Sequence, residues 1–373
     1  MIKVIGLLSP VIVPFILSVL LLLSSERNNK PKKFLSAYML MISFVFLANL
    51  FYFEHNYKIY SWVHSVHIAT VLGIYPGAYV YILLLLRPDI PVRRLYLHFI
   101  PALFFLIASA SIFFPLLSPD ERIIFLKEYR FHPDFSRTWM KILYYVRMAN
   151  IATLFIQVVL YLVLTMVTLG KHHQRMEKIF SNPDKYRMNW LRFFNIALAL
   201  AAFVSVFLYA VNPAKLFGDD RYLAFPLLLI AIILWFLGIM GNNQQPLPSE
   251  AVTAGEEDET AIIPGSDLSE KLIRYFNSSQ PFLDPELKIW DVAREIGTNR
   301  TYISQAINRE FNQNFAGFVN SYRIRKAEEI IRNEKNVSLT DLADKVGFGS
   351  VSSLIRSFQE FTGKSVTDYR KTI

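Results

Sequence analysis

Two short segments in the last quarter of the chain carry side chains that can hydrogen-bond to the edges of nucleic-acid bases. In the first segment, four polar residues at i, i+3, i+4 and i+7 share one helix face beside an arginine: Arg300, Thr301, Ser304, Gln305 and Asn308. In the second segment, the corresponding outward positions are Ser352, Ile355, Arg356 and Gln359. Arginine can make two hydrogen bonds to guanine, and glutamine or asparagine can make two to adenine. We therefore predict that these residues contact DNA, with a phosphate contact or ordinary surface as the alternative for any single one.

A helix and a tight turn precede the first of these segments. In residues 287–311, "LKIWDVAREIGTNRTYISQAINREF", Gly297 allows a left-handed turn and Asn299 can cap the helix that follows. The apolar residues recur at helical spacing and are expected to face inward: Ile289, Val292, Ala293, Ile296, Ile303 and Ile307. A helix, a turn of about three residues and a second helix make up the helix-turn-helix motif.

The same arrangement occurs again in residues 338–361, "SLTDLADKVGFGSVSSLIRSFQEF". Gly347 stands at the turn and Ser350 at the cap, and the inward positions are Leu339, Leu342, Ala343, Val346, Leu354 and Phe358. Between the two motifs, "FAGFVNSYRIRKAEEIIRNE" predicts one long amphipathic helix. The pattern thus predicts two recognition helices joined by a connecting helix.

The C-terminal hundred residues resemble the DNA-binding domain of the AraC/XylS family. The resemblance is carried by residues of "VGFGSVSSLIRSFQEFTGKSVTDYRK", namely Gly347, Phe348, Ser350, Ser352, Arg356, Phe358, Phe361, Gly363, Tyr369 and Arg370. It implies two helix-turn-helix units bridged by a helix, with each recognition helix entering a major groove of double-stranded DNA. The succession of a multispan region, an acidic linker and this domain also looks like membrane-bound bacterial regulators of the family.

The first 240 residues have the composition of a membrane protein. The chain is 53% hydrophobic and 18% charged, and apolar stretches of roughly 20 residues, enough to cross a bilayer, recur through this region. We predict seven spans, with a very apolar soluble helical bundle as the rival: Val4–Leu23, Phe34–Phe53, Trp62–Leu86, Leu95–Leu117, Met140–Leu169, Leu191–Val211 and Tyr222–Met240.

Basic residues collect in alternate loops between these spans. The three loops contain Arg27, Lys30, Lys32 and Lys33, then Arg87, Arg93 and Arg94, then Lys171, Arg175, Lys178, Lys185 and Arg187. Because positive loops stay in the cytoplasm, this pattern predicts a bacterial inner-membrane protein with an outside N-terminus and a cytoplasmic C-terminal domain. The pair His172 and His173 is expected to be part of a solvated loop.

The chain divides into three parts by composition. Residues 1–241 contain the apolar spans, residues 242–265 are an acidic linker, and residues 266–373 form a polar domain. The net charge of +9 divides as +12, −5 and +2 over these parts, so charge alone does not indicate DNA binding. The linker is rich in Pro, Gly and Glu and has little to bury. Its acidic residues 256–259 are interpreted as solvating, with a cover for a basic DNA-binding face as the alternative.

Four polar residues within the spans are candidates for a ligand pocket. His64 and His67 share one helix face, as do Arg147 and Asn150. Polar groups in hydrocarbon are costly and often functional. The alternatives are that Arg147 extends to the interface and that the histidines bond to neighbouring groups.

Motifs for catalysis and for metal or cofactor binding are missing from the sequence. It contains no cysteine, HExxH, GxSxG or P-loop pattern, so we predict neither an enzyme nor a cofactor or metal site. The predicted fold is all-α. The predicted function is a membrane-anchored, sequence-specific transcription regulator whose partners are DNA, the lipid bilayer, a small-molecule signal and, in a homodimer, a second copy. The alternative is a transporter or receptor whose cytoplasmic tail binds a protein.

Overall fold

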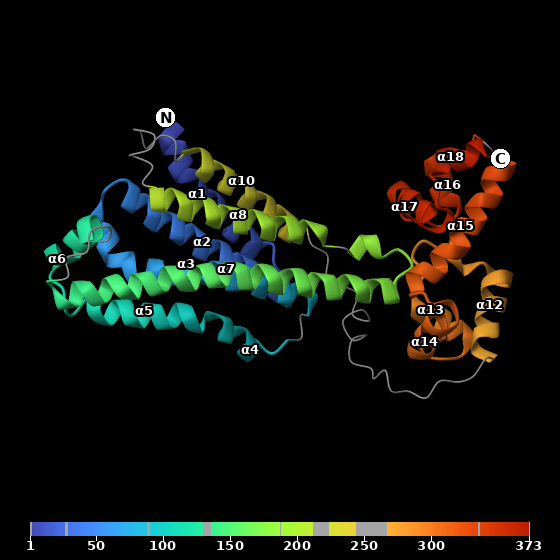
Figure 1. The fold of residues 1–373 in the computed structure, drawn as a ribbon, viewed down its shortest axis with the longest axis horizontal. Helices are drawn as coiled ribbons and strands as arrows, with labels where there is room; N and C mark the ends of the chain where they lie inside the picture. The colour runs from blue at the N-terminus through green and yellow to red at the C-terminus, as the bar shows by residue number, and fades with distance from the viewer. Residues whose placement is uncertain are drawn as a thin grey trace. The chain divides into compact units, whose positions relative to one another are not determined.

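The chain folds into two helical units, each with its own core (Figure 1). The computed structural model describes residues 2–26, 29–87, 90–129, 136–186, 188–211, 224–243, 267–334 and 336–372. Within these ranges every regular element is helical, apart from an isolated β-bridge between Phe180 and Lys288. The first unit comprises Met1–Val167 and Asn189–Pro246, and the second comprises Thr168–Met188 and Leu247–Ile373. The all-α prediction is confirmed, and the predicted linker lies almost entirely outside the described residues.

Where they are described, the predicted spans of the first unit lie mostly in helical segments, and the fourth of them is divided among α4, η1 and α5. The elements are α1 (Ile2–Leu23), α2 (Lys30–Phe53), α3 (Tyr57–Leu86), α4 (Val92–Tyr96), η1 (Leu97–Phe99), α5 (Ile100–Phe113), α6 (Pro119–Ile124), η2 (Phe125–Tyr129), α7 (Thr138–Ile179), α8 (Asn189–Val211) and α10 (Ala224–Asn242). Among the described residues, five stretches are long and apolar enough to cross a membrane: Ile5–Leu23, Lys30–Phe53, Tyr57–Leu86, Arg93–Phe113 and Thr138–Ile179. Residues 227–242 of α10 form a shorter apolar helix. The prediction of seven spans therefore has five clear counterparts.

Small and hydroxyl-bearing residues hold the helices of the first unit together. Helix α1 packs against α2 and α10, α2 against α3, and α3 against α5. Ser36 donates a hydrogen bond to the backbone of Ser18 (2.7 Å), and Ser65 bonds to Ser109 (3.0 Å). A Cβ on Gly77 would lie 2.6 Å from the Tyr38 ring, so only glycine allows this approach of α3 to α2. Such contacts are those expected between helices that have no hydrophobic driving force to associate.

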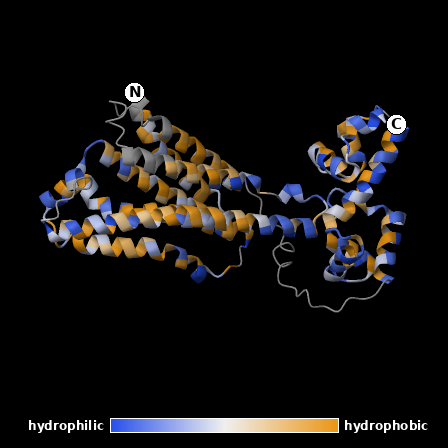
Figure 2. Ribbon diagram, viewed as in Figure 1, coloured by the Kyte–Doolittle hydropathy of each residue, from blue (hydrophilic) through white to orange (hydrophobic). Residues whose placement is uncertain are grey.

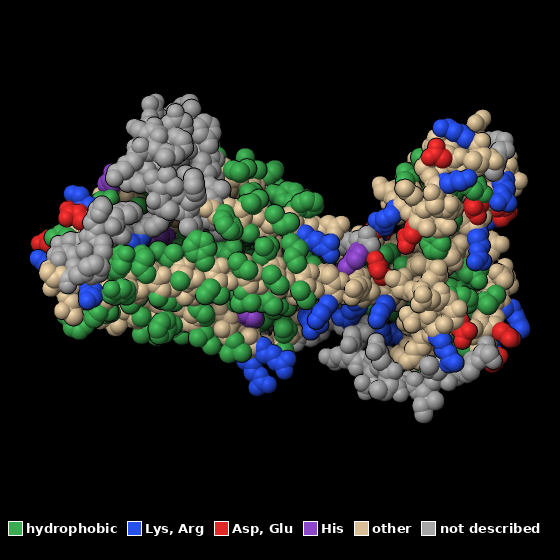
Figure 3. All heavy atoms as spheres, viewed as in Figure 1, with side chains coloured by type: hydrophobic (Ala, Val, Ile, Leu, Met, Phe, Trp, Pro, Cys, Tyr) green, Lys and Arg blue, Asp and Glu red, His purple; other side chains and the backbone are tan. Residues whose placement is uncertain are grey.

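The outward surface of the first unit is apolar. Large hydrophobic side chains on α1, α5, α7, α8 and α10 are exposed, among them Phe104, Ile156 and Phe193. Figure 2 shows apolar residues along these helices, and in Figure 3 hydrophobic side chains cover much of the visible face of this unit. An apolar surface of this extent indicates contact with lipid or protein.

The second unit is built from short helices around two cores. They are α12 (Asp267–Ser279), η5 (Pro281–Leu283), α13 (Ile289–Ile296), α14 (Arg300–Phe311), α15 (Phe315–Asn333), α16 (Leu339–Lys345), α17 (Val351–Thr362) and α18 (Val366–Lys371). One core joins α12, α13, α14 and the beginning of α15, and the other joins the end of α15 to α16, α17 and α18. Helix α15 thus contributes to both.

The end of α7 and the turn η3 (Pro183–Tyr186) belong to this second unit. Met176, Ile179 and Phe180 are buried in the first of its cores, and the Phe180 ring lies 4.0 Å from that of Tyr186. His172 is buried with its Nε2 3.2 Å from the Tyr186 carbonyl oxygen, and His173 lies 3.1 Å from Glu177. The interpretation of these histidines as part of a solvated loop is therefore wrong, because the helix continues beyond the apolar stretch and packs through its own apolar face.

Candidate nucleic-acid interface

Helices α13 and α14 form the first helix-turn-helix motif as the sequence predicts. Gly297 ends α13 with φ of +74°, in the left-handed region. The Asn299 side chain accepts a hydrogen bond from the Tyr302 backbone (3.0 Å) and so caps α14. The predicted inward residues Ile289, Val292, Ala293, Ile303 and Ile307 are buried, and Ile296 is partly buried against the same core.

Helices α16 and α17 form the second motif with closely similar local chemistry. Gly347 has φ of +83°, and a Cβ there would lie 2.6 Å from the carbonyl oxygens of Phe282 and Leu283, so both conformation and space require glycine. The Ser350 side chain caps α17 by accepting from the Ser353 backbone (3.2 Å). Leu342, Ala343, Val346, Leu354 and Phe358 are buried, and Leu339 packs against them.

The nine residues predicted to contact DNA lie on α14 and α17. Ser352, Ile355, Arg356 and Gln359 are exposed on α17, as expected for an outward stripe. On α14 Asn308 is exposed, whereas Arg300, Thr301, Ser304 and Gln305 are half-buried. The outward stripe of α17 is thus confirmed as a surface, while the role of each residue in DNA contact stays a prediction.

A buried arginine that the sequence analysis did not identify connects α15 to the rest of the unit. Arg323 is fully buried, and its side chain donates to the carbonyl oxygens of Phe282 (2.7 Å), Asp284 (2.8 Å) and Ser181 (3.3 Å) and to side-chain oxygens of Ser181, Asn182 and Asn320. Burial lowers the pKa of Arg323 to about 9, and the guanidinium stays charged at pH 7 because its donors have acceptors. Its "YRIRKAEE" context is that of an ordinary helix surface, so no local signal marks it.

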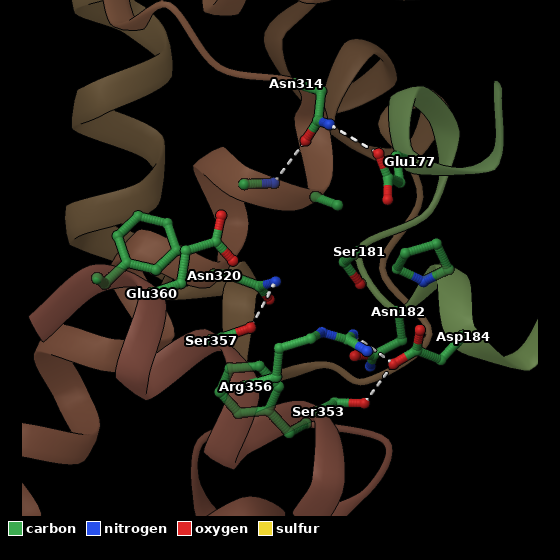
Figure 4. A pocket seen from close by; sticks show the side chains of 15 residues that line it. Glu177, Ser181, Asn182, Asp184, Asn314, Asn320, Ser353, Arg356, Ser357 and Glu360 are labelled. Atoms are coloured by element: carbon green, nitrogen blue, oxygen red, sulfur yellow. Dashed lines mark hydrogen bonds and ion pairs between the residues drawn. The ribbon is translucent and has the colours of Figure 1, made fainter. Parts of the chain in front are cut away.

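The segment after α7 contacts the second helix-turn-helix motif and the residues that precede α13. The Asn182 side chain donates to the carbonyl oxygens of Pro285 (2.6 Å) and Gly347 (3.1 Å), and Lys185 pairs with Glu286 (3.0 Å). Asp184 accepts hydrogen bonds from Ser353 (2.6 Å) and Arg356 (2.7 Å) of α17 (Figure 4). An arginine predicted to read bases is therefore paired with a carboxylate of the same unit.

The four residues predicted to form a ligand pocket are buried in the first unit. The Tyr60 hydroxyl lies 3.0 Å from His67 Nδ1 and 3.4 Å from His64 Nδ1, so the structure brings the two histidines together on one phenol. Arg147 and Asn150 are buried on α7. Tyr60, His64 and His67 are spaced to share one helix face, and this spacing could have identified Tyr60 as their partner.

Comparison with known proteins agrees with the motif geometry. Residues 292–372 match the family model described as "Helix-turn-helix domain". Over these residues the chain is therefore similar to helix-turn-helix domains. The match begins in α13 and extends through α18, and so includes both motifs and the helix between them.

Two curated proteins are similar to the chain. "Uncharacterized HTH-type transcriptional regulator YtdP" of Bacillus subtilis is 21% identical over 204 residues, which are 53% of this chain and 24% of that protein. "Msm operon regulatory protein" of Streptococcus mutans is 23% identical over 87 residues, 23% of this chain and 31% of that protein. The chain thus spans about a quarter to a third of the length of these relatives. The solved C-terminal domain of AraT, a response regulator from Geobacillus stearothermophilus, is 22% identical, with 29% of this chain and 87% of that one covered and a TM-score of 0.27.

Proposed function

We propose that the protein is a membrane-anchored transcription regulator that binds specific DNA sequences through α14 and α17. The observation that carries the proposal is the pair of capped helices, each following a left-handed glycine turn, whose polar stripes include Arg300 and Arg356. Each stripe has the residue types that read base edges in a major groove. The two relatives named as regulators support the same proposal.

The membrane part of the proposal rests on the apolar outer surface of the first unit and on its five long apolar helices. We propose seven spans, with α8 and α10 as the last two, and the orientation that the basic loops predict. A reporter fused after Gly241 is then expected to be active in the cytoplasm, and one inserted between Ser118 and Trp139 to be active outside. Reversed signals would contradict the proposal, because the helix-turn-helix motifs could not meet DNA.

Chromatin immunoprecipitation with the full-length chain tests the DNA-binding part. The wild type is expected to enrich sites with two major-groove contacts about 10 bp apart on one face of the DNA. Combined Gln305→Ala and Arg356→Ala substitutions are expected to abolish this enrichment, since each base contact contributes about 1–3 kcal/mol. Lys271→Ala is the matched control, because Lys271 is a solvent-exposed cation paired with Asp267 on α12. If the immunoprecipitated wild type enriches no DNA sequence and a cytoplasmic protein is recovered with it instead, the alternative of a receptor with a protein-binding tail is correct.

We propose further that the first unit senses a small molecule near His64, His67, Arg147 and Asn150. Such a ligand shifts a conformational equilibrium by its differential affinity for the two states. His67→Leu and Arg147→Leu are expected to abolish induction of a reporter driven by the identified operator at matched membrane levels. Unchanged induction in both variants would end the pocket proposal and leave the DNA-binding proposal standing.

A further inference from the structure

The turn η3 places a carboxylate on the helix that is proposed to read DNA. Asp184 Oδ2 lies 2.7 Å from Arg356 Nη2 and 2.6 Å from Ser353 Oγ, and both partners belong to α17. The Arg356 side chain is still 52% exposed, so the pair lies at the surface from which α17 would meet DNA.

The surroundings of this pair are acidic. Asp184, Arg356, Glu177 and Glu360 are the charged residues around an open cavity of about 130 Å³ (Figure 4). Three carboxylates therefore accompany one guanidinium. DNA presents a dense array of phosphates, and a protein surface gains affinity for it by neutralising them. The surface around this cavity beside α17 instead has more negative than positive side chains, and negative charge repels phosphate.

The segment that carries Asp184 is firmly held on the helix-turn-helix unit. Phe180 is buried among residues of α13, α14 and α15, and the Ser181 backbone N–H donates to the Leu287 carbonyl oxygen (3.1 Å). Arg323 and Asn182 add the buried hydrogen bonds described above. Asp184 is thus held beside Arg356 by contacts that do not involve DNA.

From these observations we infer that η3 is an internal inhibitor of DNA binding, in which Asp184 competes with DNA for Arg356. The inference rests on the proposed function. A bidentate contact with guanine needs two N–H groups of Arg356 and a surface free of nearby negative charge. The Asp184 pair removes one donor, neutralises the guanidinium and would bring a carboxylate close to phosphates. DNA binding and the Asp184–Arg356 pair therefore oppose each other, which is a thermodynamic coupling between two sites.

The position of η3 in the chain identifies the element that would release it. Asp184 follows the fifth predicted span, Met140–Leu169, by 15 residues, and both α7 and η3 are ordered parts of the chain. A movement of α7 can therefore displace Asp184 from Arg356 of α17 without any other segment taking part. The seventh span and the linker after it, which connect to α12, are not needed for this route.

The test uses the full chain in lipid nanodiscs and a duplex selected from a random-sequence pool. Asp184→Asn keeps the size of the side chain and removes its charge, and it is expected to tighten binding at least about fivefold, the lower end of ordinary coupling. The plot of log affinity against log salt should also become steeper, by about one unit, as expected for one more effective cationic contact. Glu286→Gln is the matched control, since it removes a negative charge from the exposed pair that Glu286 makes with Lys185 of η3, and it should change affinity less than twofold.

The Arg356→Ala background decides whether the effect acts through this pair. There Asp184→Asn should lose most of its gain, because the competing partner is gone and only the repulsion between the carboxylate and phosphates remains. Weaker binding by Asp184→Asn would overturn the inference and show that Asp184 orients Arg356 toward DNA. No change, or an equal gain from Glu286→Gln, would overturn it as well. A wild-type chain and an Asp184→Asn chain that both select no sequence would overturn the proposed function itself.

Discussion

The two units of the molecule differ in where their large apolar side chains lie: many are exposed in the first unit, and nearly all are buried in the second. In the first unit large hydrophobic residues are exposed, with Phe193 at 72%, Ile156 at 66% and Phe104 at 62%. In the second unit the most exposed large hydrophobic residue among those described is Ile355, at 38%. The second unit thus buries its apolar surface in its own cores, which stabilises it in water. The exposed apolar surface of the first unit fits the lipid surroundings that we propose for it, and its helices meet through close contacts such as that of Gly77 with Tyr38.

The largest effect is expected from Phe180→Ala, which removes the buried ring that the residue directly after α7 contributes to the core of the second unit. The ring contacts Tyr186 and Trp290, and its loss should lower the free energy of unfolding by about 3–5 kcal/mol. Urea titration followed by Trp290 fluorescence measures it. Phe361→Ala is the control, because Phe361 is 37% exposed and its loss should cost far less. Equal effects would mean that the α7 segment is not part of this core.

A charge on the outer face distinguishes the two surroundings most directly. Ile156→Asp on α7 should reduce membrane insertion by about 2.5–3.5 kcal/mol, because Ile156 lies near the middle of the predicted fifth span. Ile355→Asp on α17 should leave the urea midpoint of the second unit nearly unchanged. Membrane insertion of the Ile156→Asp variant is measured as the fraction of the protein that stays in the membrane after alkaline extraction. A fully soluble and folded Ile156→Asp protein would contradict the assignment of this face to lipid.

Helix contact in the first unit is tested by Gly77→Ala. The added Cβ would meet the Tyr38 ring at 2.6 Å, and moving that ring threatens the hydrogen bond from the Tyr38 hydroxyl to the Ile74 carbonyl oxygen. We expect a loss of about 1–3 kcal/mol, measured as the midpoint of helix loss in detergent titrated with dodecyl sulfate. At Gly170 of α7 a Cβ would meet nothing within 4 Å, so Gly170→Ala should instead stabilise the helix by up to about 1 kcal/mol.

The smallest effect is expected at the cap of α17. Ser350→Ala removes the acceptor for the Ser353 backbone N–H and should cost about 1 kcal/mol in the urea titration. Ser352→Ala, two residues later on the exposed face, should leave stability within about 0.5 kcal/mol. If Ser352→Ala were the more destabilising of the two, the beginning of α17 would have to be placed differently.

Much of the second unit follows from local sequence pattern. The turn glycines Gly297 and Gly347 have the positive φ that their position predicts, and the caps at Asn299 and Ser350 are in place. These features could be predicted because each depends on residues within a few positions of one another. The apolar spacing also predicted the inward faces of α13, α14, α16 and α17.

At the end of α7 the local pattern led to a wrong prediction, because the helix extends to Ile179 where a loop was expected. Residues 171–187 read as a basic loop because charge dominates their composition. Met176, Ile179 and Phe180 nevertheless keep the i, i+3, i+4 spacing of a helix face, and this signal could have extended the helix. No sequence feature, however, indicates that this face packs against residues more than a hundred positions away.

The sequence by itself determined the helical class, the apolar stretches of the first unit and the two helix-turn-helix motifs, because these depend on composition and on periodicity over one or two turns. Only the tertiary structure decided that Arg323 is buried and that Asp184 is paired with Arg356. Arg323 and Arg356 each depend on partners from the α7–η3 segment, over 140 residues earlier in the chain. Whether a charged side chain faces water, a carbonyl oxygen or a carboxylate depends on which distant segment packs beside it, and no local pattern contains that information.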